Sequence, residues 1–99
     1  MSSDWLFDQP PNCAVITLRQ IMNGDQQILH VSHDSDDGGW QFLSHGTPEI
    51  EDCIVVSLKR VVKHDPSVLA IADLPLGWCA DRCSTEETWK RIPNSTAEG

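Results

Sequence analysis

The clearest structural signal in the chain lies in residues 28–45, which read ILHVSHDSDDGGWQFLSH. Apolar and polar residues alternate through 28–34 and again through 39–45, and this period of two is typical of β-strands. The four residues between them favour a turn, because Asp bonds its own turn backbone and Gly accepts a positive φ. The segment therefore predicts a β-hairpin.

A four-residue loop would also fix the register of this hairpin. The predicted pairs are Asp34 with Gly39, His33 with Trp40, and Val31 with Phe42. Alternate residues of a strand share a face. One face is then expected to hold Leu29, Val31, His33, Trp40 and Phe42. The other is expected to hold His30, Ser32, Gln41 and His45, together with Ile28 and Leu43.

Further strands are indicated on both sides of the hairpin. Residues 13–19 are rich in β-branched residues and carry apolar side chains on both faces, which predicts a central strand. Residues 53–56 predict a short buried strand. Residues 78–83 and 88–92 predict a closing hairpin around the polar residues 84–87.

Two helical segments follow the fourth predicted strand. Ser57 can cap a helix over residues 58–64. Asp65 before Pro66 favours the start of a second helical piece that runs through Asp73. The predicted fold class is therefore α+β, with an antiparallel-dominated sheet of about five to six strands and one or two short helices packed on one face.

The chain length of 99 residues suits one domain. We expect an N-terminal lead-in at 1–12, a single α+β domain at 13–92 and a disordered tail at 93–99. No apolar run approaches the ~20 residues of a membrane span, and the N-terminus lacks the basic and apolar regions of a signal peptide. These features predict a cytoplasmic protein that does not enter a membrane.

Acidic residues dominate the charge balance, with fifteen Asp and Glu against seven Lys and Arg and a formal net charge of −8. Phosphate contacts dominate affinity for nucleic acids, so this balance argues against a nucleic-acid partner. It favours a basic protein surface, although net charge also keeps small proteins in solution. The residues expected to meet such a partner are Asp34, Asp36, Asp37, Glu49, Glu51 and Asp52, with exposed Trp40 or Trp89 as an apolar anchor.

The histidines raise a metal or small-ligand site as the alternative. His30, His45 and Asp34 are ligand types that Zn²⁺ accepts. His30 and His33 are three residues apart, so a regular strand points them to opposite faces. The turn after Asp34 does not match a calcium loop, because its Gly and Glu positions are wrong. The leading interpretation includes no cofactor.

Cysteine and catalytic patterns give little support to an enzyme. Cys13 and Cys53 lie in apolar runs typical of buried free thiols. Cys79 and Cys83 are four residues apart, about 13 Å along a strand, which is too far for a disulfide or a shared metal ion. The chain contains no C-x-x-C, G-x-S-x-G, P-loop or G-x-G-x-x-G pattern. No catalytic residue is assigned.

Several segments together resemble small bacterial proteins of unknown function that are similar to immunity-protein-like domains, some of which are encoded beside bacterial toxins. The segments that carry the resemblance are residues 28–34, 38–43, 55–58, 65–69 and 72–78. The most characteristic is Asp-Asp-Gly-Gly-Trp-Gln-Phe-Leu at 36–43, and the resemblance covers most of 13–92. It implies an α+β fold and protein binding, and it assigns no active residue. The leading interpretation is therefore a non-enzymatic protein-binding module.

Overall fold

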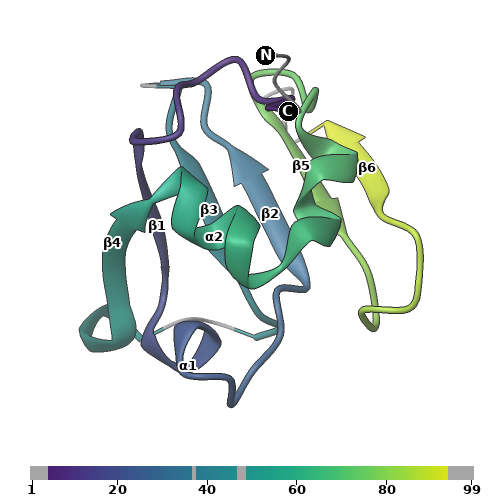
Figure 1. Cartoon of the computed structure of the whole chain (residues 1–99). Helices are drawn as coiled ribbons and strands as arrows, with labels where there is room; N and C mark the ends of the chain where they lie inside the picture. The colour runs from purple at the N-terminus through teal and green to yellow at the C-terminus, as the bar shows by residue number, and fades with distance from the viewer. Residues whose placement is uncertain (1–4, 37, 47–48, 94–99) are drawn as a thin grey trace.

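The computed structural model describes residues 5–36, 38–46 and 49–93 and contains a six-stranded sheet in the order β4-β1-β3-β2-β5-β6 (Figure 1). All neighbouring strands are antiparallel except β1 and β3. The helical segments lie on one face of the sheet (Figure 1). The predicted α+β class is confirmed. The elements are β1 (Ala14–Leu18), α1 (Arg19–Met22), β2 (His30–His33), β3 (Trp40–Leu43), η1 (Ile50–Asp52), β4 (Cys53–Ser57), α2 (Leu58–His64), η2 (Pro66–Ile71), β5 (Trp78–Asp81) and β6 (Lys90–Pro93).

The β2–β3 hairpin has the register that its alternation predicted. His33 lies opposite Trp40 and Val31 opposite Phe42. The Asp34 amide donates to the Gly39 carbonyl at 2.8 Å, which closes the loop. The alternation predicted the register correctly because a slip by one residue would move every apolar side chain to the wrong face.

The alternation breaks just before β2. His30 lies opposite Leu43 in register, and the amide of Leu29 also donates to the Leu43 carbonyl at 2.9 Å. Two residues therefore oppose one, which is the arrangement of a β-bulge. The extra residue reverses the faces, so Ile28 is fully buried whereas Leu29 is half-buried. The expectation that Ile28 lies on the face away from the core is wrong for this reason.

An aromatic cluster forms the centre of the core. The Trp40 ring stacks on His33 with centroids 4.1 Å apart and meets Phe7 edge-on at 5.0 Å. Its indole N–H donates to Gln9 Oε1 at 2.9 Å. Trp40 is only 1% exposed, so the expectation of a surface anchor at this position is wrong. The lead-in packs as part of the domain, because Phe7 is also buried.

The helices form where capping residues were expected. Ser57 Oγ accepts from the Arg60 amide at 3.2 Å and starts α2. Asp65 accepts from the Ser67 amide at 3.1 Å at the start of η2, which is a 3₁₀ helix. Pro66 at its first position fits, because a proline lacks only an N–H that has no partner there. The apolar side chains that these two helices bury are Leu58, Val61, Val68 and Ile71.

In the described part of the chain, helices cover one face of the sheet and leave the other open. Val15 and Thr17 of β1 are buried beneath the helices, whereas Ile16 between them is 37% exposed. β1 is central, as predicted, but its second face is open. β4 lies at the edge of the sheet, and Val55 is 67% exposed. The expected buried strand at 53–56 is therefore an edge strand.

β6 ends the described part of the chain. Pro93 belongs to β6, and the rest of the tail expected at 93–99 lies outside the described residues. In the described part of the chain, no helix is long and apolar enough to cross a membrane.

Arg82 directly follows β5 and joins three parts of the fold. Its guanidinium donates from Nε and Nη2 to the Ile28 carbonyl at 3.1 and 2.9 Å. The same group bonds Asp65 Oδ2 at 3.1 Å and lies 4.0 Å from the centre of the Trp89 ring. The Arg82 side chain is 1% exposed. A charge this deeply buried needs all of these partners to offset its desolvation.

We expect Arg82→Ala to lower the free energy of unfolding by about 3–5 kcal/mol, because it leaves the Ile28 carbonyl and Asp65 without their buried partner. Urea unfolding followed by circular dichroism measures the loss. Arg91→Ala is the matched control, since Arg91 bonds the exposed Asp73 at 2.7 Å and its loss should be much smaller. Equal losses in the two variants would contradict the role assigned to Arg82.

Candidate functional site

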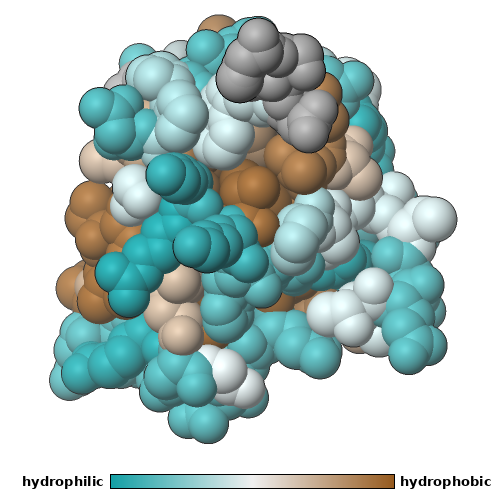
Figure 2. Space-filling view, viewed as in Figure 1, coloured by the Kyte–Doolittle hydropathy of each residue, from teal (hydrophilic) through white to brown (hydrophobic). Residues whose placement is uncertain are grey.

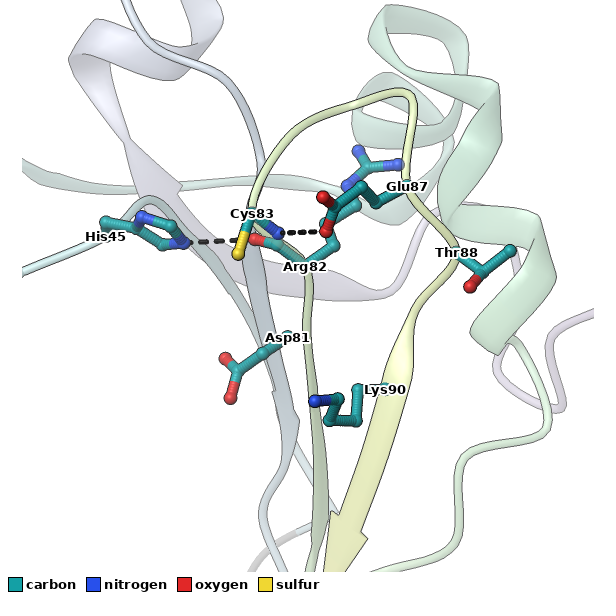
Figure 3. A pocket seen from close by; sticks show the side chains of 7 residues that line it. All are labelled: His45, Asp81, Arg82, Cys83, Glu87, Thr88 and Lys90. Atoms are coloured by element: carbon teal, nitrogen blue, oxygen red, sulfur yellow. Dashed lines mark hydrogen bonds between the residues drawn. The ribbon is translucent and has the colours of Figure 1, made fainter.

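A cavity lies at the end of the sheet where β3 ends and the β5–β6 connection turns (Figure 3). Its volume is about 460 Å³, and both acidic and basic side chains border it. Its lining residues are His45, Asp81, Arg82, Cys83, Glu87, Thr88 and Lys90. Four of the seven come from the segment 81–87, so the geometry of this connection shapes the site.

Two hydrogen bonds hold the wall of this cavity. His45 Nε2–H donates to the Arg82 carbonyl at 3.0 Å, which ties the segment after β3 to the end of β5. The Cys83 amide donates to Glu87 Oε1 at 3.2 Å and closes the connection on itself. In Figure 3 the side chains of Asp81 and Cys83 lie on the side of the strand that faces His45. The position of this wall therefore depends on Arg82, because its carbonyl accepts the His45 hydrogen bond.

His30 and Asp81 form a paired group beside the cavity. They lie opposite each other on β2 and β5, and His30 Nδ1 is 2.5 Å from Asp81 Oδ1. A neighbouring cavity of about 240 Å³ is bordered by His30, His45 and Asp81. The structure thus brings His30 and His45 to one small cavity, together with a carboxylate that sequence reasoning did not select.

Asp34 does not belong to this group. It follows β2, whereas His45 follows the antiparallel strand β3, so the two residues lie at opposite ends of the sheet. Asp34 Oδ1 accepts from the Asp36 amide at 3.0 Å and serves the turn. Within residues 5–36, 38–46 and 49–93, no three or more His, Cys, Asp or Glu side chains are placed to hold a metal ion. The proposed His30, His45 and Asp34 set is not assembled.

The carboxylates that were expected to form one partner surface also lie at opposite ends of the sheet. Asp34 and Asp36 lie at the end of the sheet where β2 stops, and Asp37 lies outside the described residues. The segment from Glu49 to Asp52 lies at the other end, because it follows β3. A single surface that contains all of these carboxylates is therefore excluded.

Carboxylates concentrate at the His45 end. Glu49 and Asp52 border a small cavity that also touches His45, and Asp81 and Glu87 border the cavity of about 460 Å³. The cations here are few. Arg19 bonds Asp52 at 3.1 Å, Arg82 is buried, and Lys90 lies opposite Asp81 on β6. We name this set the acidic end; its carboxylates are Glu49, Glu51, Asp52, Asp81, Glu86 and Glu87.

Trp89 is a structural side chain at this end rather than an exposed anchor. It is half-buried, and its indole N–H donates to the Ser67 carbonyl at 3.2 Å. The Arg82 guanidinium lies over its ring. Both interactions hold the β5–β6 connection against η2, so the ring is already engaged within the chain.

Sequence reasoning missed Asp81, Arg82, Glu87 and Lys90. Asp81 and Lys90 face each other across β5 and β6, a cross-strand pair that becomes visible only once the register is known. On the covered side, His33 packs against Trp40, as the predicted register indicated. His33 Nδ1–H donates to the Leu74 carbonyl at 2.7 Å, and Nε2 is buried without a hydrogen-bond partner among the described residues.

Comparison with protein-family models, with curated proteins and with solved structures finds no match to this chain. The chemistry of the acidic end is therefore the basis for a proposed function.

We expect the two cysteines of this region to differ in reactivity. Burial raises the pKa of the Cys79 thiol, and the nearby Asp81 charge raises it further, whereas Cys83 is exposed at the cavity. Since the thiolate is the reactive form, Cys83 should react at least about ten-fold faster with a disulfide reagent. Rates for Cys79→Ser and Cys83→Ser, measured in the folded protein, assign the fast phase. A fast phase that survives Cys83→Ser but not Cys79→Ser would contradict the arrangement.

Proposed function

We propose that the chain is a non-enzymatic, cytoplasmic protein-binding module whose acidic end meets a basic partner, in the manner of an immunity or antitoxin-like inhibitor. The observation that carries the proposal is that carboxylates border the cavities on both sides of His45, while Arg19 and Arg82 are already bonded within the chain. Among the described residues, the acidic end sets its six carboxylates against the cations Arg19, Arg82 and Lys90, so it carries excess negative charge overall.

A recess with carboxylates on its rim suits a lysine or arginine side chain of a partner. The cavity of about 460 Å³ has room for one such side chain, and Asp81 and Glu87 supply acceptor oxygens. Negative charge at a rim mainly raises the association rate, and salt screens the effect. The partner contemplated is a basic protein surface rather than a nucleic acid.

Charge reversal at the acidic end tests the proposal. Glu49→Lys and Glu86→Lys change exposed carboxylates on opposite sides of His45. With the reduced protein immobilised and native-source lysate passed over it at low salt, we expect a basic chain to be retained stoichiometrically by the wild type. The double variant should retain at least about ten-fold less of it.

Asp36→Lys is the matched control, because it makes the same charge change at the other end of the sheet. It should leave retention unchanged. Retention that is lost with Asp36→Lys and kept with the double variant would contradict the assignment to the acidic end. Retention insensitive to salt and to both variants would contradict an electrostatic mechanism.

A small-ligand site is the second candidate, and the cavity bordered by His30, His45 and Asp81 favours it. The His30–Asp81 hydrogen bond fixes the imidazole, which leaves Nε2 to bond a ligand. The described side chains do not form a metal group, so a small polar organic molecule suits the cavity better than an ion.

A set of small polar fragments, followed by amide NMR, tests this second candidate. Binding at the cavity should shift the amides of His30, Ser44 and Asp81, and His45→Ala should abolish those shifts while leaving the rest of the spectrum in place. Adding Zn²⁺ in the same NMR assay tests whether the cavity binds a metal ion instead. The absence of localised shifts at sub-millimolar fragment or zinc would remove the candidate.

A further inference from the structure

The two edges of the sheet are built differently. β6 reads Lys-Arg-Ile-Pro and β4 reads Cys-Ile-Val-Val-Ser. Lysine and proline at an edge prevent another strand from adding to it, because a charge resists burial and proline lacks an N–H. β4 carries neither protection. Its outer side adjoins no other described strand.

β4 also exposes apolar surface. Val55 is 67% exposed and lies opposite Ile16, which is 37% exposed, on the open face of the sheet. Figure 2 shows hydrophobic surface along the edge where Figure 1 places β4, beside the hydrophilic surface over α2. An apolar edge strand with unpaired backbone groups is a template for a further strand.

The hydrogen-bond pattern shows which backbone groups of β4 face outward. The Leu58 amide donates to the Cys13 carbonyl, so these two residues are a hydrogen-bonded pair in the β1–β4 register. Bonded and non-bonded pairs alternate in an antiparallel ladder. Val56 and Ile54 therefore bond toward β1, whereas the N–H and C=O groups of Val55 point away from the sheet.

We propose that β4 pairs antiparallel with β4 of a second copy of this chain, about a two-fold axis at Val55. This register is possible because the N–H and C=O groups of Val55 point outward in both copies. Val55 of each copy can then exchange both backbone hydrogen bonds with Val55 of the other. Cys53 and Ser57, which also point outward, would then face each other across the axis. The sheet would become continuous through twelve strands, twice the six of one copy.

Charge complementarity selects a second copy rather than an unrelated strand. The segment before β4 is acidic, with Glu49, Glu51 and Asp52, and the helix after it is basic, with Lys59, Arg60 and Lys63. Glu51 lies in η1 directly before β4, and Lys59 lies in the first turn of α2 directly after it. In the two-fold arrangement the acidic segment of one copy therefore lies beside the basic start of α2 of the other, and the same proximity repeats on the far side. An antiparallel copy thus sets opposite charges together at both ends of the strand, whereas a parallel copy would set like charges together.

Sedimentation velocity of the reduced full chain over a wide concentration range tests the proposal. The wild type should dimerise, and Val55→Lys should raise the dissociation constant at least about ten-fold. Val55→Pro should do the same, because it removes an outward N–H that the fold does not use. Ile92→Lys is the matched control, since Ile92 lies on the same face at the protected β6 edge. It should not change the constant.

Mixing two charge variants tests the proposed charge pairing between the two copies. Glu51→Lys alone and Lys59→Glu alone should each weaken the dimer, and an equimolar mixture of the two variants should form a mixed dimer in which both pairs are restored. Circular dichroism checks that each variant is folded. If a variant is unfolded, hydrogen exchange of the Val55 amide in the wild type tests the proposal instead. Strand pairing should slow this exchange increasingly as the protein concentration rises.

Three results would overturn the proposal: a wild-type chain that is monomeric at every concentration, a dimer that Val55→Lys and Ile92→Lys affect equally, or a mixture of charge variants no tighter than each alone. Glu86 lies on the β5–β6 connection, away from β4. Glu86→Lys should weaken retention of a basic partner and leave the dimer intact, so the two proposals can fail separately.

Discussion

A single buried guanidinium joins three segments at the end of the sheet that holds the candidate site. Arg82 bonds the Ile28 carbonyl at the bulge, the Asp65 carboxylate that caps η2, and the face of Trp89 in the β5–β6 connection. The β2–β5–β6 ladder and the hydrogen bond from Trp89 to the Ser67 carbonyl also join these segments, and the guanidinium adds one partner that all three share. The carbonyl of Arg82 in turn receives the His45 hydrogen bond that forms the cavity wall. The interactions of the guanidinium offset the cost of burying its charge.

The open face and the acidic end follow from the same arrangement. Both helices pack on one side of the sheet, so Ile16 and Val55 remain exposed on the other. The antiparallel pairing of β2 and β3 then separates the turn acids from the acids after β3. The described part of the chain therefore exposes a charged end and an apolar edge, and these are different surfaces with different chemistry.

Local patterns in the sequence predicted the hairpin, the Ser57 and Asp65 caps and the α+β class, because each depends on neighbouring residues alone. They could not predict that the Ile-Val-Val run of β4 is an edge, since strand order is set by long-range packing. An apolar run looks the same at the centre and at the edge of a sheet. The bulge at Leu29 and the burial of Arg82 were likewise invisible, because both depend on partners far along the chain.

The central claim is that Arg82 couples η2 to the β5–β6 connection. A double-mutant cycle of Asp65→Asn and Trp89→Leu, measured by urea unfolding, tests it most directly, because both side chains contact the guanidinium. The account expects a coupling energy of about 0.5–3 kcal/mol that disappears when the cycle is repeated with Arg82→Met. Strictly additive effects in the wild type, or a coupling that persists without Arg82, would contradict it.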